Sequence, residues 1–148
     1  MDKSKNDDVA VFTVKPIYAN AIISGEKTVE FRRNGSPSNI TYMVVYSTSP
    51  DKKIIGVCDV TTCIAASPQN LWRRFRSNGL ISRKEFFIYF DGVSTGKCYL
   101  LKNPKKFVRP ILLKNCWSFS KSPQSFVYIE KKEWIRLKKK KTCKLRKR

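Results

Sequence analysis

Two cations and a carboxylate that could act on one ligand lie close together in the chain, at Lys27, Glu30 and Arg32. In an extended segment successive side chains point to opposite faces, so Val29 and Phe31 are predicted to face a core and Glu30 and Arg32 the other side. Lys27 follows a glycine turn and can therefore curl toward Glu30. A solvated surface ion pair, which contributes only about 0 to 1 kcal/mol, is the simpler interpretation.

The residues around this group predict the elements that hold it. Residues 11–15 alternate as a strand does, and Pro16 and Gly25 suit the start and the stop of a short helix. Two more strands are predicted at 42–50 and 53–60, with a turn around Pro50 and Asp51 between them. The order strand, helix, strand therefore places the charged segment at the start of the second strand.

The middle of the chain predicts two helices, at 67–79 and 82–92, each opened by a serine cap. Glu85, three residues after Ser82, completes a capping box, which gives it a structural role. Two strands are predicted to follow, at 96–101 and 106–111, joined by a turn at Asn103 and Pro104.

The pattern Gly-x-Lys-x-x-Glu-x-Arg, met here at Gly25, Lys27, Glu30 and Arg32 after the first helix, resembles the hallmark of the ASCH domain, a branch of the PUA-like superfamily. The segments 46–50, 55–57 and 122–129 agree in order, so the resemblance spans about residues 10–130. It implies an α+β fold, a PUA-like bent mixed β-barrel with flanking short helices. It also implies a cleft beside the first helix that handles RNA or modified nucleosides.

The length of 148 residues suits a single domain. We predict a disordered N-terminus at 1–9, the ASCH/PUA-like domain at 10–130, and a short helix with a basic tail at 131–148. The sequence contains no apolar run of the roughly 20 residues that a membrane helix needs, and residues 1–8 lack the character of a secretory signal. We therefore expect an intracellular protein, cytoplasmic or nuclear.

The charge predicts a polyanionic partner. The chain has 31 basic and 11 acidic residues, a net charge of +20, and half of this excess lies after residue 130. Nucleic acid is the expected partner, because each neutralised phosphate releases counterions. The tail has too few apolar residues to bind a membrane surface. It also suits a nuclear import signal, and the plain alternative is a solvated, disordered end.

The sequence predicts no cofactor and no metal. Its five cysteines match no zinc spacing, and histidine is absent. Serine–histidine and cysteine–histidine catalysis are therefore excluded.

Further candidate contacts to nucleic acid, with RNA favoured over DNA, come from three sources. Arginines three residues apart on one predicted helix suit phosphates, and aromatic residues on a loop suit stacking with bases. The others flank the motif or belong to the segment 46–50 of the resemblance. The candidates are Thr28, Arg33, Tyr46, Ser47, Arg73, Arg76, Trp117 and Phe119. The two loop aromatics fit equally well as a plug at the mouth of the barrel.

Several functions remain open for the motif. In a binding module, possibly regulating transcription or translation, the cations hold phosphates and Glu30 reads a base edge or a ribose. In a metal-independent ribonuclease, Glu30 takes the 2′-hydroxyl proton while Lys27 and Arg32 stabilise the phosphorane. One ASCH branch resembles an amidohydrolase of acetylated cytidine, but Glu30 stands where that branch has threonine. An adaptor for acidic protein partners is the alternative without nucleic acid.

Overall fold

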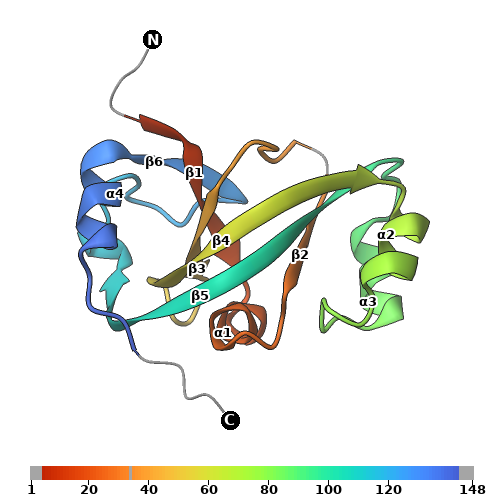
Figure 1. Cartoon of the computed structure of the whole chain (residues 1–148), viewed down its shortest axis with the longest axis horizontal. Helices are drawn as coiled ribbons and strands as arrows, with labels where there is room; N and C mark the ends of the chain where they lie inside the picture. The colour runs from red at the N-terminus through yellow and green to blue at the C-terminus, as the bar shows by residue number, and fades with distance from the viewer. Residues whose placement is uncertain (1–4, 34, 144–148) are drawn as a thin grey trace.

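The computed structural model describes residues 5–33 and 35–143, in which six strands form one curled sheet with helices around it (Figure 1). The strands are β1 (Lys5–Val14), β2 (Val29–Arg32), β3 (Tyr42–Ser47), β4 (Lys53–Ala66), β5 (Gly96–Leu112) and β6 (Phe126–Glu130). The helices are α1 (Pro16–Ser24), α2 (Pro68–Phe75), α3 (Arg83–Tyr89), η1 (Leu113–Asn115), a short 3-10 turn, and α4 (Lys131–Lys138).

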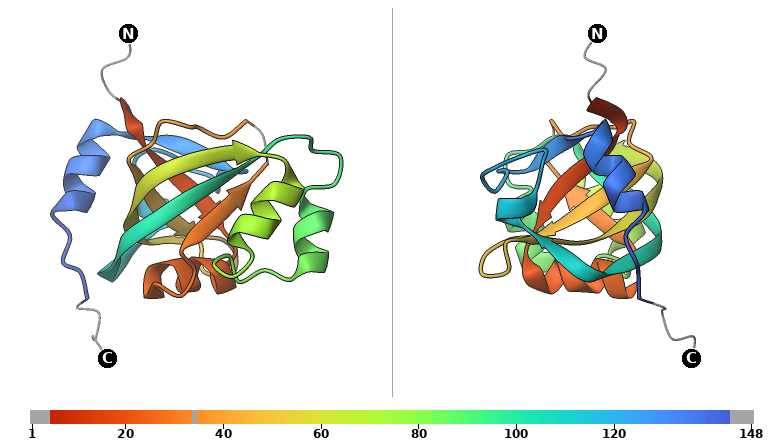
Figure 2. Two further views of the ribbon diagram at one scale, coloured as in Figure 1. Left: turned by 45° about the vertical axis from the view of Figure 1, so that its right-hand side comes forward. Right: turned by 90° about the vertical axis from the view of Figure 1, so that its left-hand side faces the viewer.

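The sheet has the strand order β2-β5-β4-β3-β1-β6. β1 and β3 pair in parallel and the other neighbours pair antiparallel, so the sheet is mixed. The long strands β4 and β5 twist strongly and carry β2 around toward β1, as the two views of Figure 2 show. The predicted class, α+β with a bent mixed barrel and flanking short helices, is confirmed.

Strict alternation along β1 and β3 divides the core into an inner and an outer layer. Phe12 and Val45 point into the barrel, where Phe12 meets Tyr99 of β5 edge-on at 5.1 Å between ring centroids. Val11 and Val44 point to the opposite face, which α4 covers. These two strands are therefore buried on both sides, which explains their nearly continuous apolar sequence.

The helices occupy three positions around the barrel. α2 and α3 lie at one end, over an apolar cluster built on Val29, Phe31 and Phe86. α4 lies at the opposite end, and α1 runs across one side between them (Figure 1). Val29 and Phe31 thus face a core, as the alternation of β2 predicts.

The local signals for helix ends are confirmed. Pro16 opens α1, and Gly25 ends it with a φ of +89°. The hydroxyl of Ser67 accepts the backbone N–H of Asn70 at 3.3 Å, and that of Ser82 accepts the N–H of Glu85 at 3.1 Å. Each cap satisfies one amide that a helix start leaves without a partner.

Strand lengths differ from the sequence prediction in three places. β1 begins at Lys5, within the 1–9 segment that the sequence predicts to be disordered, and Val9 is completely buried. β4 continues to Ala66, and β5 is one strand through Asn103 and Pro104. Register shifts between β4 and β5 absorb the proline and the positive φ of Asn103, because a bulge leaves a residue outside the ladder.

The basic end begins as ordered structure. After α4 the backbone N–H of Val108 donates to Lys141 O at 2.9 Å, and the N–H of Cys143 donates to Lys106 O at 2.8 Å. The segment therefore runs back along β5. The rest of the predicted basic tail, 144–148, and residues 1–4 of the predicted disordered N-terminus lie outside the described residues. In the described part of the chain, none of the helices is long and apolar enough to traverse a membrane.

At Gly56 the backbone of β4 lies close against that of β5. A Cβ there would fall against the backbone carbonyl oxygen of Lys105 and 2.8 Å from Ile23 Cδ1. We expect Gly56→Ala to lower the free energy of unfolding by about 3 kcal/mol, because this backbone cannot yield without breaking the sheet. Urea denaturation measures it, with Thr62→Ala, an exposed change in the same strand, as the control. Equal stability of the two variants would contradict the close approach.

Candidate nucleic-acid cleft

A cleft with a volume of about 890 Å³ opens beside α1, between β2, α3 and the segment that leads into β6. Lys27, Glu30 and Arg32 line it, and they are 3%, 7% and 8% exposed. Ionised groups are seldom this buried unless they are paired. The predicted face of β2 therefore points into a real concavity.

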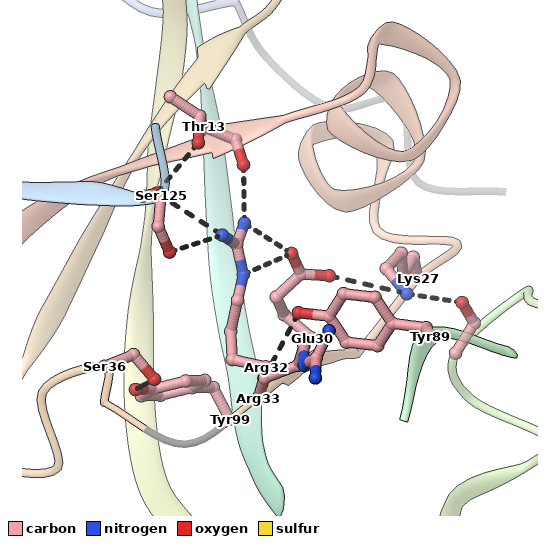
Figure 3. A network of polar contacts seen from close by, with 10 residues as sticks. Thr13, Lys27, Glu30, Arg32, Arg33, Ser36, Tyr89, Tyr99 and Ser125 are labelled. Carbon is pink, nitrogen blue, oxygen red and sulfur yellow. Dashed lines mark hydrogen bonds and ion pairs between the residues drawn. The ribbon is translucent and has the colours of Figure 1, made fainter. Parts of the chain in front are cut away.

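Glu30 lies between the two cations (Figure 3). Its Oε2 accepts hydrogen bonds from Arg32 Nη2 at 2.8 Å and from Arg32 Nε at 3.1 Å. Its Oε1 lies 3.7 Å from Lys27 Nζ. Arg32 thus fixes the carboxylate, and Oε1 is the oxygen turned toward Lys27.

Arg32 also closes the barrel. β2 and β6 stand at opposite ends of the strand order, yet Arg32 Nη2 donates to Thr13 O of β1 at 2.6 Å. Arg32 Nη1 donates to Ser125 O, just before β6, at 3.3 Å. One side chain therefore joins the two edges of the curled sheet where no backbone ladder does. Arg32 Nε, Nη1 and Nη2 are all engaged by these partners, so Arg32 positions the site more than it offers donors to a ligand.

Lys27 is held at the floor of the cleft by backbone contacts. Its backbone N–H donates to Ala21 O at 3.0 Å, which curls the chain after α1, and its Nζ donates to Gly79 O. Burial lowers the pKa of Lys27, and the charge of Glu30 partly opposes that shift. A cation whose charged form is destabilised in this way gives up its proton more readily than an exposed lysine.

Two phenols complete the walls. The hydroxyl of Tyr18 on α1 donates to Glu85 Oε2 on α3 at 3.0 Å, across the cleft. Burial first, and then Glu85, raises the pKa of Tyr18. The hydroxyl of Tyr89 accepts the backbone N–H of Arg33 at 3.2 Å (Figure 3). Glu85 therefore does more than the predicted capping: its backbone is capped by Ser82 and its carboxylate faces the cleft.

Of the predicted site residues, the structure brings Lys27, Glu30 and Arg32 together in the cleft. Thr28 and Arg33 are exposed beside it, outside its lining. Arg73 and Arg76 are exposed on and just after α2, also outside the lining, and their contact with phosphate stays a prediction.

Four other predicted contacts lie elsewhere for a physical reason. Tyr46 and Ser47 are completely buried, because β3 is an interior strand covered on both faces. The Tyr46 ring packs edge-on against Phe119 at 5.5 Å, so Phe119 belongs to the outer core layer. Trp117 is exposed near α4, away from the cleft lining. Tyr46 and Ser47 therefore lie in the core and Phe119 is half-buried, and the contacts of these three residues with nucleic acid stay predictions.

Several cleft residues escaped the sequence analysis. Thr13, Tyr18, Gln124 and Ser125 carry polar atoms into the lining from segments that read as ordinary strand, helix and loop. The sequence did contain a signal for Gln124 and Ser125, because residues 122–129 belong to the ASCH resemblance. The polar pairs across the cleft join residues 67 to 112 positions apart, which no local pattern encodes.

The donors present do not suit a metal. Within residues 5–33 and 35–143, no three histidine, cysteine or acidic side chains gather closely enough to hold an ion. Glu30 is already paired with two cations, and a third positive charge beside it would be repelled.

The bent mixed barrel with its cleft beside α1 is a PUA-like α+β fold. The N-terminal domain of Staphylothermus marinus McrB shares it with a TM-score of 0.55 at 13% identity, covering 93% of this chain and 97% of that one. At that identity the likeness concerns the fold alone.

A family model for the ASCH domain matches residues 12–135, and the chain belongs to the ASCH family. The "ASCH domain-containing ribonuclease" of Zymomonas mobilis is 32% identical over 132 residues, which cover 86% of this chain and 88% of that protein. A crystal structure of ASCH from Zymomonas mobilis has a TM-score of 0.81 at 30% identity, covering 92% of this chain and 98% of that one.

Proposed function

We propose that this protein binds single-stranded RNA in the cleft and cleaves it without a metal ion. The observation that carries the proposal is the buried group of Lys27, Glu30 and Arg32 on the cleft floor. A carboxylate and a lysine 3.7 Å apart offer a proton acceptor and a proton donor to the same phosphodiester. Arg32 keeps the carboxylate in place.

The walls suit an unpaired nucleotide. The lining combines three cations and two carboxylates with apolar and phenolic surface from α1 and α3. A nucleotide brings one phosphate for the cations and one flat ring for the phenols, and aromatic stacking contributes roughly 1 to 3 kcal/mol per base. A volume of about 890 Å³ is that of a small-molecule site. Duplex RNA, whose bases are paired and stacked, is therefore not the expected substrate.

The reaction is a transfer within the RNA. Glu30 Oε1 takes the proton of the 2′-hydroxyl, whose oxygen forms a bond to the adjacent phosphorus. The bond from phosphorus to the 5′-oxygen breaks, and Lys27 gives its proton to that oxygen. The lowered pKa of Lys27 makes it a better acid than an exposed lysine. Afterwards the proton passes from Glu30 back to Lys27, and the product ends in a 2′,3′-cyclic phosphate.

One comparison and one chemical requirement bear on this choice. The Zymomonas relative, whose name includes ribonuclease, matches over most of both chains. RNA is preferred over DNA because the step needs the 2′-hydroxyl. The amidohydrolase of acetylated cytidine is less well supported, since Glu30 occupies the threonine position and Thr28 is exposed outside the lining.

The test is cleavage of end-labelled single-stranded RNA in excess chelator. We expect cyclic-phosphate ends from the natural protein and a rate at least about 100-fold lower for Glu30→Gln, because general-base catalysis contributes about 10²–10⁴-fold. Glu26→Gln changes an exposed carboxylate near the cleft and should cleave normally. DNA of the same sequence should remain intact. Uncut RNA under conditions where it is bound would reject the ribonuclease and leave a binding module.

A further inference from the structure

The end of the molecule that carries α4 has a second hollow, of about 450 Å³, between the end of β5, η1 and α4. It shares no lining residue with the cleft, and α4 lies at the end of the molecule opposite α3 (Figure 1). Lys114, Arg136 and Lys140 surround Trp117 there. Among the described residues that line it, none is acidic.

Hydrogen bonds to Glu133 and a contact with Arg136 fix the position of Trp117. Glu133, completely buried, accepts the backbone N–H groups of Trp117 at 2.6 Å and of Ser118 at 3.0 Å. Arg136 Nη2 donates to Glu133 Oε2 at 2.9 Å, and its guanidinium carbon lies 3.7 Å from the centre of the Trp117 ring. The ring itself remains 46% exposed. The exposed part of this fixed ring offers a flat apolar surface on which a ligand could stack.

Positive charge is crowded around this ring. Glu133 is already engaged by Arg136 and two backbone amides, so it offsets only one of the cations. Lys132 Nζ lies 5.8 Å from the Trp117 ring centre. Partial burial first, and then Arg136 and Arg109, lowers the pKa of Lys140. Arg136 Nε is buried without a hydrogen-bond partner in the described structure. A bound anion would relieve this crowding.

We propose that this hollow is a second nucleic-acid site, which stacks one unpaired base on the exposed part of Trp117 and holds adjacent phosphates with Lys114 and Lys140. A base supplies the flat apolar face and the strand supplies the anions, a combination that an acidic peptide lacks. A long single strand occupies both this site and the cleft, whereas a very short one occupies either alone. The site goes beyond the proposed cleavage and does not depend on it.

The test uses 2′-O-methyl oligonucleotides, which the proposed cleavage step cannot cut. For a twenty-nucleotide strand, Trp117→Ala should weaken binding five-fold or more, since stacking loss of about 1 to 3 kcal/mol corresponds to that range. Lys114→Ala, on an exposed side chain, should weaken it and lower the slope of log affinity against log salt by about 0.7. A four-nucleotide strand should be affected much less. Lys102→Ala, which removes an exposed cation from another part of β5, is the matched control.

Crosslinking separates this site from the cleft. A strand carrying 5-iodouridine should crosslink to the peptide that contains Trp117, in the natural protein and in Lys27→Met alike. Natural affinity and salt slope in both Trp117→Ala and Lys114→Ala would overturn the proposal, whatever the outcome of the cleavage assay. It would equally be overturned if a glutamate-rich peptide of the same charge displaced the oligonucleotide as effectively as unlabelled strand, because the hollow would then be a protein-binding surface.

Discussion

Lys27→Met is expected to abolish RNA cleavage, by about 10³-fold or more, while the protein stays folded. The variant removes the proposed proton donor and keeps a side chain of similar length. Glu30 keeps both hydrogen bonds from Arg32 in this variant, so the buried carboxylate is not left without a partner and the loss of stability should be smaller than for Arg32→Met. Single-turnover cleavage of labelled RNA measures the first effect, and urea denaturation at neutral pH measures the second.

The pH dependence of stability identifies the same lysine. Because the native pKa of Lys27 is lowered, the unfolded chain binds more protons between that pKa and the ordinary value of 10.5. The difference between the free energy of unfolding of the natural protein and that of Lys27→Met should therefore increase, in favour of the natural protein, as pH rises through this window. Lys15→Met, an exposed change at the cleft mouth, should weaken RNA binding and preserve cleavage. Cleavage by Lys27→Met at the natural rate would contradict the assigned role.

Arg32→Met is expected to lower the free energy of unfolding by about 3 to 5 kcal/mol, the usual cost of breaking a buried ion pair from one side. The change removes both hydrogen bonds that Arg32 donates to Glu30 Oε2 and the one that it donates to Thr13 O. It also removes the contact that joins the two edges of the sheet, so the barrel should open at that seam. Equilibrium urea denaturation measures the loss, and hydrogen exchange should show it first in β2 and β6.

Two variants make this prediction specific. Arg33→Met changes the exposed neighbour and should alter stability by less than about 0.5 kcal/mol. The double variant Glu30→Gln with Arg32→Met should regain part of the loss, because the carboxylate left without its partner is gone. If Arg32→Met unfolded at the same urea concentration as the natural protein, the closure of the sheet would not depend on Arg32.

The two predictions describe one design. Burial destabilises the charged form of Lys27, as its lowered pKa shows. Arg32 is buried with most of its donors engaged. We propose the first as the reactive group, and the second holds the carboxylate between them. Activity should therefore follow Lys27 and Glu30, whereas stability should follow Arg32.

The sequence by itself determined what depends on neighbours in the chain. Period-two alternation in β2 put Val29 with the core and Glu30 with Arg32, and the glycine turn let Lys27 reach the same side. Serine caps and Pro16 located the helices for the same local reason. The ASCH motif identified the family, because its residues, from Gly25 to Arg32, also lie within a short stretch.

Only the tertiary structure decided which distant segments meet. Arg32 reaches Ser125, 93 residues away, and Tyr18 reaches Glu85, 67 residues away, because the sheet curls. The same curl buries Tyr46 between two packed faces and puts Trp117 beside α4 instead of the cleft. Side-chain spacing fixes which face of an element a residue occupies, but the twist summed over six strands fixes what that face meets.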